Sequence, residues 1–170
     1  MGDLGLLRRC APRNNMSKIL FHILLLSLIL LSVFSCQTTG VDTVLVTRVI
    51  DGDTIVLAGG EHLRYIGMDT PEIGQLYYEE AKKANEELVL GKKVRLEKDV
   101  SEVDRYKRLL RYVYVDDTFV NAELVRRGLA RAKAYRPDIK HQSELEALEK
   151  EAILEGIGLW SLKPSLPGRR

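Results

Sequence analysis

Three short runs of β-branched and aromatic residues between positions 43 and 68 constrain the fold of this chain most. Their sequences are TVLVTRVI, DTIVLA and EHLRYIGM, and turn-forming pairs separate them, Asp51-Gly52 and Gly59-Gly60. Such pairs are typical of tight turns between antiparallel strands. The sequence therefore predicts an antiparallel meander at the start of the domain. It argues against a parallel sheet built from alternating strands and helices.

The remainder of the chain predicts two further strands and three helices. Asn121 is placed as the N-cap of the second helix, and Ser143 with Glu146 forms a capping box at the start of the third. A helix inserted between the third and fourth strands of a strongly bent sheet is typical of an OB-type barrel. The predicted fold is therefore α+β, a five-stranded OB-fold β-barrel with three α-helices. The expected ranges are 92–99 and 107–115 for the strands, and 76–90, 121–130 and a stretch from Ser143 for the helices.

The N-terminal part of the chain resembles an export signal. The segment MSKILFHILLLSLILLSVFSC begins at Met16 with one lysine, continues as an apolar run and ends at Cys36. A basic start, an apolar centre and small residues at the end are typical of a secretory signal. The cysteine after SVFS resembles the lipobox of bacterial lipoproteins, in which this residue is lipidated. We expect residues 1–36 to be a lipoprotein-type export segment that truly starts at Met16; an uncleaved anchor and plain secretion remain open.

Charge and cysteine content place limits on the exported part. Of the 26 basic and 24 acidic residues, four basic and one acidic lie in residues 1–36, so the rest has a net charge of −1. Net charge therefore gives no argument for nucleic-acid binding, and only a local basic patch can. The mature chain keeps one cysteine, Cys36, and so has neither a disulfide nor a cysteine metal site. We expect residues 37–41 to form a linker and 163–170 a tail.

Two aspartates are predicted to meet at one end of the meander. Asp53 starts the second strand and Asp69 ends the third, and these positions lie at the same end of an antiparallel sheet. Two carboxylates there repel each other unless a cation lies between them. Oxygen ligands favour Ca²⁺ or Mg²⁺ over zinc, and two carboxylates leave most ligand positions to water and substrate. The sequence thus predicts a weakly held divalent ion whose coordination a phosphate oxygen completes.

Two arginines are predicted beside these acids. Arg64 lies in mid-strand, where a buried guanidinium needs an anionic partner. Arg108 lies on the same face of the fifth strand as Leu110. Two guanidinium groups beside a metal make a clamp for a phosphodiester, and Tyr106 and Tyr135 can stack on bases or bind a terminal phosphate.

The motifs IDGDT, LRYIGMDTPE, DRYKRLLRYVYV, NAELVRRGLA and AYRP, in this order, resemble the staphylococcal nuclease (thermonuclease) family. The resemblance covers residues 42–161, and we expect the nuclease domain to span 42–162. It implies an OB barrel with three helices and calcium-dependent, sequence-nonspecific hydrolysis of single- or double-stranded DNA and RNA to 3′-phosphate ends. We expect a monomer that is exported, either anchored to the membrane on its extracytoplasmic side or secreted.

The resemblance also assigns site residues to three groups. The first holds the metal: Asp53, Asp69 and the carbonyl of Thr70 as ligands, with Asp51 as a nearby supporting acid. The second acts on the phosphate: Arg64 and Arg108 bind it, and Glu72 positions or deprotonates the attacking water. The third contacts the nucleotide: Arg105, Tyr106 and Tyr135.

Two positions depart from the family pattern. Lys107 stands where the family commonly has a glycine, between Tyr106 and Arg108, and a glycine there often serves a turn with positive φ. Lysine at this position either bends the loop differently or adds a cation for the substrate. Lys133 replaces a family tyrosine two residues before Tyr135.

Two rival functions remain open. An OB-fold module can bind single-stranded nucleic acid without cutting it, but binding alone needs neither a pair of metal carboxylates nor a water-positioning glutamate. The motif DGDTI also fits the pattern of phosphotransferases with a nucleophilic aspartate. That chemistry needs a parallel sheet, which the turn signals after Asp53 do not predict.

Overall fold

The computed structural model describes residues 42–161. The expected export segment 1–36 with Cys36, the linker 37–41 and the tail 163–170 lie outside the described residues. Within the described range, no helix combines the length and the apolar character that crossing a membrane requires.

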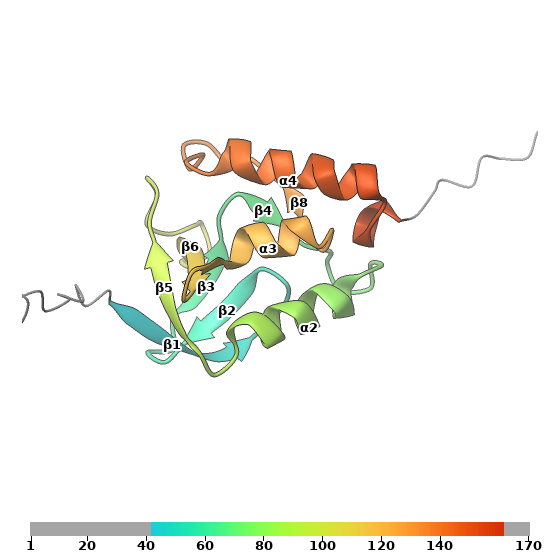
Figure 1. Ribbon diagram of the computed structural model, residues 1–170. Helices are drawn as coiled ribbons and strands as arrows, with labels where there is room; N and C mark the ends of the chain where they lie inside the picture. The colour runs from blue at the N-terminus through green and yellow to red at the C-terminus, as the bar shows by residue number, and fades with distance from the viewer. Residues whose placement is uncertain (1–41, 162–170) are drawn as a thin grey trace, which may run out of the picture. The chain divides into compact units, whose positions relative to one another are not determined.

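Five strands close into a barrel (Figure 1). Each neighbouring pair in the order β3-β2-β1-β5-β6 is antiparallel, and parallel pairing of β3 with β6 closes the ring. A short strand, β7, extends the sheet beyond β6. The predicted five-stranded barrel is confirmed. The strands are β1 Thr43–Val49, β2 Thr54–Leu57, β3 His62–Tyr65, β5 Lys93–Glu97, β6 Leu109–Val115 and β7 Thr118–Phe119.

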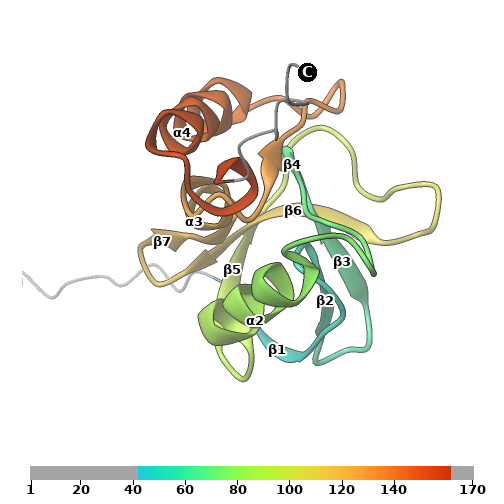
Figure 2. The same ribbon diagram turned by 90° about the vertical axis from the view of Figure 1, so that its right-hand side faces the viewer.

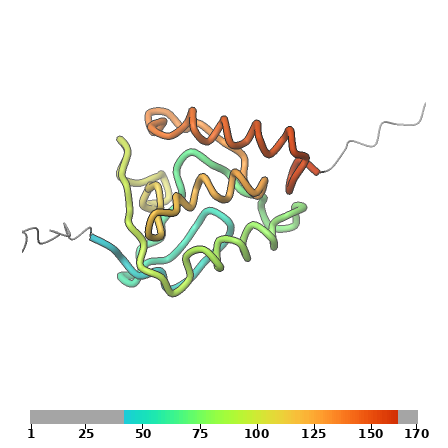
Figure 3. The backbone as a smooth tube through the Cα atoms, viewed as in Figure 1, coloured from blue at the N-terminus to red at the C-terminus, as the bar shows by residue number. Residues whose placement is uncertain are grey.

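Within residues 42–161, three α-helices accompany the barrel, as predicted. Helix α3 lies between α2 and α4, and the backbone trace in Figure 3 follows the three in turn. Helix α2 directly precedes β5 in the sequence. The long connection between β5 and β6 is a loop that projects from the barrel (Figure 2). The helices are α2 Tyr78–Val89, α3 Val120–Arg126, α4 Gln142–Glu155 and the short 3₁₀ helix η1 Gly158–Trp160.

The core fills the barrel and continues beneath the helices. Val46, Ile55, Leu63 and Val94 are fully buried inside the barrel, and Leu145 of α4 belongs to the same cluster. Burying such apolar side chains is the main favourable term in folding. The core therefore joins the helices to the strands that carry the predicted site.

The predicted N-cap of α3 is wrong. Phe119 holds the cap position, and Asn121 lies inside the helix with no exposed surface. Its side-chain amide donates to the carbonyl of Ile66 at 2.9 Å and accepts from the backbone N–H of Val113 at 3.0 Å. Because a buried amide must be satisfied, Asn121 serves to join α3 to β6 and to the link that follows β3 rather than to start the helix.

The predicted capping box of α4 is also wrong. The helix begins at Gln142, and His141 occupies the cap position without a side-chain cap bond. His141 instead contacts Glu97 of β5, with Nε2 3.0 Å from Oε1. The residue at the cap position thus joins the start of α4 to β5.

The third predicted strand breaks in two. Strand β3 ends at Tyr65 and a separate strand β4, Met68–Asp69, follows after Gly67, whose φ is +78°. A Cβ at Gly67 would lie 2.6 Å from Leu145, so glycine is required there by both conformation and space. Strand β4 pairs with β8, Arg131–Ala132. Asp69 therefore ends β4 and not β3, the barrel strand that carries Arg64.

Glu97 provides a pH-dependent link between β5 and α4. Desolvation favours its neutral form, but hydrogen bonds from Lys140 and His141 outweigh it and hold the pKa of Glu97 at about 2, below its ordinary value of 4.5. A depressed carboxyl pKa stabilises the fold above the unfolded-state value, and this contribution is lost as the pH falls from about 4.5 to about 2.

We expect Glu97→Gln to lower the free energy of unfolding by about 1 kcal/mol at pH 7, because the link is only partly buried. The difference from wild type should shrink below pH 4.5 and vanish near pH 2. Urea unfolding across this range measures it, with the exposed Glu151→Gln on α4 as control. A difference that does not change with pH would show that the charge of Glu97 is not the cause.

Candidate functional site

A cavity of about 780 Å³ opens beside β3 and β4 and is bounded by the loop between β5 and β6 and by the segment after β8. Eight of the ten residues predicted for the domain's site line it. The other two, Asp53 and Thr70, lie buried behind its wall. The eight are Asp51, Arg64, Asp69, Glu72, Arg105, Tyr106, Arg108 and Tyr135.

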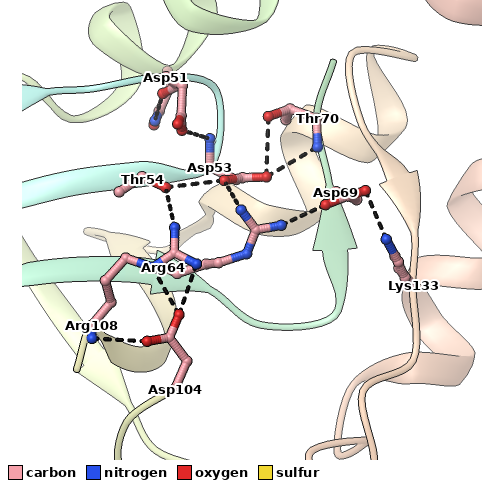
Figure 4. A network of polar contacts seen from close by, with 10 residues as sticks. Asp51, Asp53, Thr54, Arg64, Asp69, Thr70, Asp104, Arg108 and Lys133 are labelled. Carbon is pink, nitrogen blue, oxygen red and sulfur yellow. Dashed lines mark hydrogen bonds and ion pairs between the residues drawn. The ribbon is translucent and has the colours of Figure 1, made fainter. Parts of the chain in front are cut away.

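Arg64 joins the two predicted metal carboxylates (Figure 4). Its Nη1 donates to Oδ1 of Asp53 at 2.7 Å, and its Nη2 donates to Oδ1 of Asp69 at 2.5 Å. Strand pairing sets this position, because Arg64 on β3 lies opposite Thr54, the residue after Asp53. Asp53 and Asp69 lie close together, but Asp69 does so from β4 in a separate two-stranded sheet, and the group that bridges the two carboxylates is a guanidinium.

Asp53 is held by a complete set of hydrogen bonds. Only 2% of its surface is exposed, and Oδ1 also accepts from the hydroxyl of Thr54 at 3.1 Å. Its Oδ2 accepts from the backbone N–H and the hydroxyl of Thr70 at 3.0 and 3.1 Å. Burial raises the pKa of Asp53 to about 6; Arg64 opposes this rise and the charge of Asp51 adds to it. Positive charge near Asp53 therefore favours its ionised form.

Asp51 and helix α2 position the turn that carries Asp53. Oδ1 of Asp51 accepts from the backbone N–H of Asp53 at 3.1 Å. The carbonyl of Asp51 accepts from the side chain of Asn85 at 3.0 Å, and Asn85 in turn accepts from the hydroxyl of Tyr65 at 2.8 Å. Asn85 and Tyr65 are both buried. This chain of bonds ties the turn to α2 and β3.

Gly52 lets Thr70 approach the same turn. A Cβ at Gly52 would lie 2.7 Å from the side chain of Thr70, which is closer than carbon atoms pack. Since Thr70 donates twice to Asp53, the glycine is needed for the carboxylate to be held. The role of the Thr70 carbonyl as a metal ligand stays a prediction.

Arg108 is oriented by Asp104. Its Nε and Nη2 donate to Oδ2 of Asp104 at 2.8 and 2.7 Å, a two-point contact that fixes the plane of the guanidinium. Its Nη1 lies 3.4 Å from the hydroxyl of Thr54, which bonds Asp53. Arg108 precedes β6, which starts at Leu109, so the expected strand from 107 begins slightly too early. Arg108 and Arg64 thus reach one cavity from separate elements.

Lys107 adopts a conformation that favours glycine. Its φ is +65°, and its backbone N–H donates to the carbonyl of Asp104 at 3.0 Å. Oδ1 of Asp104 also accepts from the backbone N–H groups of Tyr106 and Arg108, at 2.8 and 3.0 Å. Lysine here thus takes the positive φ that glycine favours, at an energetic cost of about 1 kcal/mol. Its role toward substrate stays a prediction.

The remaining predicted residues are exposed at the edge of the cavity. Glu72 is exposed, and its backbone bonds to Gln75 in a turn. The rings of Tyr106 and Tyr135 are also largely accessible, and the guanidinium of Arg105 lies 4.7 Å from the centre of the Tyr106 ring. Exposed aromatic rings beside cations suit stacking on bases.

Four site residues were missed by the sequence analysis. Asp104 has a weak local signal, an acid four residues before Arg108. Asp138 is buried, lines the cavity and accepts from two backbone N–H groups of the β5–β6 loop at 3.0 and 2.7 Å. Asn85 has no local signal, because its partners lie 20 and 34 residues away. Lys133 was noted only as a departure, and its contact with Asp69 was not expected.

The donor set fits a hard divalent cation. The cation between Asp53 and Asp69 in this structure is the guanidinium of Arg64, so an ion that binds both carboxylates would take its place. Within residues 42–161, no cluster of three or more His, Cys, Asp or Glu side chains is placed to hold an ion. Water, backbone and substrate would therefore supply most of the ligands, as Ca²⁺ allows.

Comparison with protein families agrees with this geometry. A family model described as "Staphylococcal nuclease homologue" matches residues 62–162. The match includes Arg64, Asp69, Glu72 and Arg108, whereas Asp53 lies before it.

Several curated proteins are similar to this chain. A thermonuclease of Staphylococcus hyicus is 42% identical over 125 residues, which cover 68% of this chain and 74% of that protein. A thermonuclease of Staphylococcus intermedius is 38% identical over 128 residues, covering 70% and 76%. Endonuclease YncB of Bacillus subtilis is 42% identical over 125 residues, covering 67% of this chain and 59% of that protein.

Proposed function

The chain belongs to the staphylococcal nuclease family and is a nuclease, and on this basis we propose that it hydrolyses phosphodiester bonds of both DNA and RNA with calcium as cofactor. The observation that supports this best is the convergence of Arg64, Arg108 and the Asp53–Asp69 pair on one cavity. The products are nucleic-acid fragments with 3′-phosphate ends. We propose that it acts as a monomer.

Arg64 and Arg108 bind the scissile phosphate. Each guanidinium can donate two parallel hydrogen bonds to phosphate oxygens. Asp104 holds Arg108 in place, and Asp53 with Asp69 holds Arg64. Donors that are held before substrate arrives need little reorganisation when negative charge develops on phosphorus.

Glu72 positions the attacking water and takes its proton. The water oxygen bonds to phosphorus as the bond from phosphorus to the 5′-oxygen breaks, and the 5′-oxygen takes a proton from solvent and leaves as a hydroxyl. The phosphate remains on the 3′-oxygen of the preceding nucleotide. Glu72 suits this role because its carboxylate is exposed at the cavity, where water reaches it.

The nucleotide lies against the rim of the cavity. Arg105, Tyr106 and Tyr135 contact its sugar, base or neighbouring phosphate through stacking and charge. These contacts do not depend on base identity, since every base has an aromatic face. The proposed activity is therefore nonspecific for sequence.

Asp53 and Asp69, with the Thr70 carbonyl, would hold the calcium ion, and Asp51 supports the turn that carries Asp53. A bound ion supplies positive charge that stabilises the developing negative charge on the phosphate. Asp69 faces the cavity directly, while Asp53 lies behind it. The residues present therefore offer one accessible and one buried carboxylate to the ion.

Incubation of the purified protein with heat-denatured DNA, and separately with RNA, tests the proposal. We expect cleavage with Ca²⁺, loss of cleavage with chelator and recovery when Ca²⁺ is restored. The fragments should prime a polymerase only after a phosphatase removes their 3′-phosphates. Cleavage that persists in chelator would contradict the metal requirement, and binding without cleavage would favour an OB-fold binding module instead.

We also propose that the enzyme acts outside the cytoplasm. The support is the apolar sequence after Met16 that ends at Cys36. An extracytoplasmic place suits a calcium enzyme and keeps a nonspecific nuclease from the cell's own chromosome. Labelling with a radioactive fatty acid, lost in Cys36→Ala, would identify a lipoprotein; label retained in the variant would contradict that assignment.

A further inference from the structure

Lys133 lies in the cavity because β8 is anchored to the broken strand. Strand β8 ends at Ala132, which pairs with Met68, and the backbone N–H of Lys133 donates to the carbonyl of Gly67 at 2.8 Å. Its side chain then extends along the cavity wall, with Nζ 5.2 Å from the centre of the Tyr135 ring. The backbone of Lys133 is therefore fixed, while its ammonium is carried on a flexible stem.

The ammonium of Lys133 shares Asp69 with Arg64. Nζ lies 2.9 Å from Oδ2 of Asp69, and Arg64 occupies Oδ1 of the same carboxylate. The side chain of Lys133 is 48% exposed and that of Arg64 only 15%. Exposed lysine–carboxylate pairs are weak, so this one can exchange partners readily.

Figure 4 places Asp69 and Lys133 on one side of Arg64 and Arg108 on the other. A phosphate held between the two arginines would thus be separated from Lys133 by Arg64, and a neighbouring phosphate of the same strand, on the Asp69 side of Arg64, would lie toward Lys133 in the same cavity. A polyanionic strand brings further phosphates, each of which competes with Asp69 for the ammonium. This part of the cavity therefore offers a phosphate the ammonium of Lys133, which can leave Asp69 to bind it.

We propose that Lys133 is a further substrate-binding residue, which exchanges Asp69 for the phosphate next to the scissile one. This inference rests on the proposed function and names one more contact in the same site. Lys133 and a divalent ion both draw on Asp69, so a substrate that removes the ammonium makes Asp69 more available to the ion. Substrate and metal then each raise the affinity for the other by the same factor.

The variant Lys133→Met tests both consequences by calorimetry, without turnover. One titration uses Ca²⁺ alone, and the others use a nucleoside 3′,5′-bisphosphate, which offers two phosphates and no internucleotide bond, with and without Ca²⁺. We expect the variant to bind the bisphosphate about 5- to 10-fold more weakly, since it loses one charged contact. It should bind Ca²⁺ alone about 3- to 10-fold more tightly, because a like charge is removed.

The coupling factor, by which bisphosphate raises Ca²⁺ affinity, should fall accordingly. With a short single-stranded oligonucleotide in place of the bisphosphate, and with no Ca²⁺ so that it is not cut, the slope of log affinity against log salt should decrease by about 0.7, the value for one phosphate contact. Lys133→Arg should restore most of the nucleotide affinity because it keeps the charge.

Lys98→Met is the matched control. Lys98 pairs with Glu102 at 2.6 Å, its side chain is 47% exposed, and it does not line the cavity. If Lys133→Met and Lys98→Met bind bisphosphate alike, Lys133 is only a surface ion pair and the inference is wrong. Tighter Ca²⁺ binding with unchanged bisphosphate affinity would also overturn it. Wild-type protein that binds neither ligand would instead refute the proposed function, and this inference with it.

Discussion

Arg108→Ala is expected to lower the rate of nucleic-acid cleavage by about 10³-fold or more. The guanidinium faces the cavity and is oriented by Asp104 before substrate arrives. Alanine removes positive charge from the place where negative charge develops on the phosphate, so the loss should lie in kcat as well as kcat/KM. Turnover of single-stranded DNA at saturating Ca²⁺ measures it.

Two further variants distinguish loss of the phosphate contacts of Arg108 from general effects of lost charge or lost folding. Arg108→Lys keeps the charge but not the planar fork, and should recover only part of the rate. Arg111→Ala is the control, because Arg111 pairs with Glu102 and does not line the cavity. Thermal unfolding checks that all three remain folded. An Arg108→Ala enzyme with near wild-type turnover would show that this arginine does not bind the scissile phosphate.

The double variant Asp53→Asn, Asp69→Asn should lose detectable Ca²⁺ binding and about 10³-fold or more in cleavage rate. Asparagine keeps the size of each side chain and can still accept from Thr70 and Arg64, but it removes two negative charges. Without them, neither the ion nor Arg64 has a charged partner. Calcium titration by calorimetry and turnover of DNA measure the two losses separately.

The exposed aspartate of the β6–β7 turn, in Asp117→Asn, is the control for loss of a carboxylate. The single variants should differ from each other. Asp53 is buried with a raised pKa, so Asp53→Asn relieves a buried charge while Asp69→Asn removes an accessible ligand. A double variant that digests nucleic acid as fast as wild type would refute the two-aspartate site.

The position of Arg64 shows how much of the site can be predicted from local sequence patterns. The turn pairs Asp51-Gly52 and Gly59-Gly60 predict two consecutive hairpins, and the hairpins place Arg64 beside Asp53. Their contact at 2.7 Å follows from that register. The side of the site formed by β2 and β3 was therefore predictable, because its parts are close in sequence.

The other side of the site was not predictable in the same way. Asp69 reaches Arg64 because the strand breaks at Gly67, where Leu145 of α4 leaves no room for a side chain. The two wrong cap assignments have a similar origin, since the side chain of Asn121 bonds to β6 and to the chain just after β3, and that of His141 bonds to β5. In each case a tertiary contact outweighs a local preference worth about 1 kcal/mol.

The periodicity of apolar residues and the turn chemistry indicated the strands and helices, because these depend on neighbours a few positions apart. Together with the family resemblance, they identified eight of the sixteen residues that line the cavity. Packing of the completed fold decided how those residues are held. Asp104 orients Arg108, α2 fixes the turn before Asp53 through Asn85, and β8 carries Lys133 onto Asp69. The last two contacts join residues 34 and 64 positions apart. No local pattern encodes such pairs, since only the closed barrel and its helices bring them within the range of a hydrogen bond.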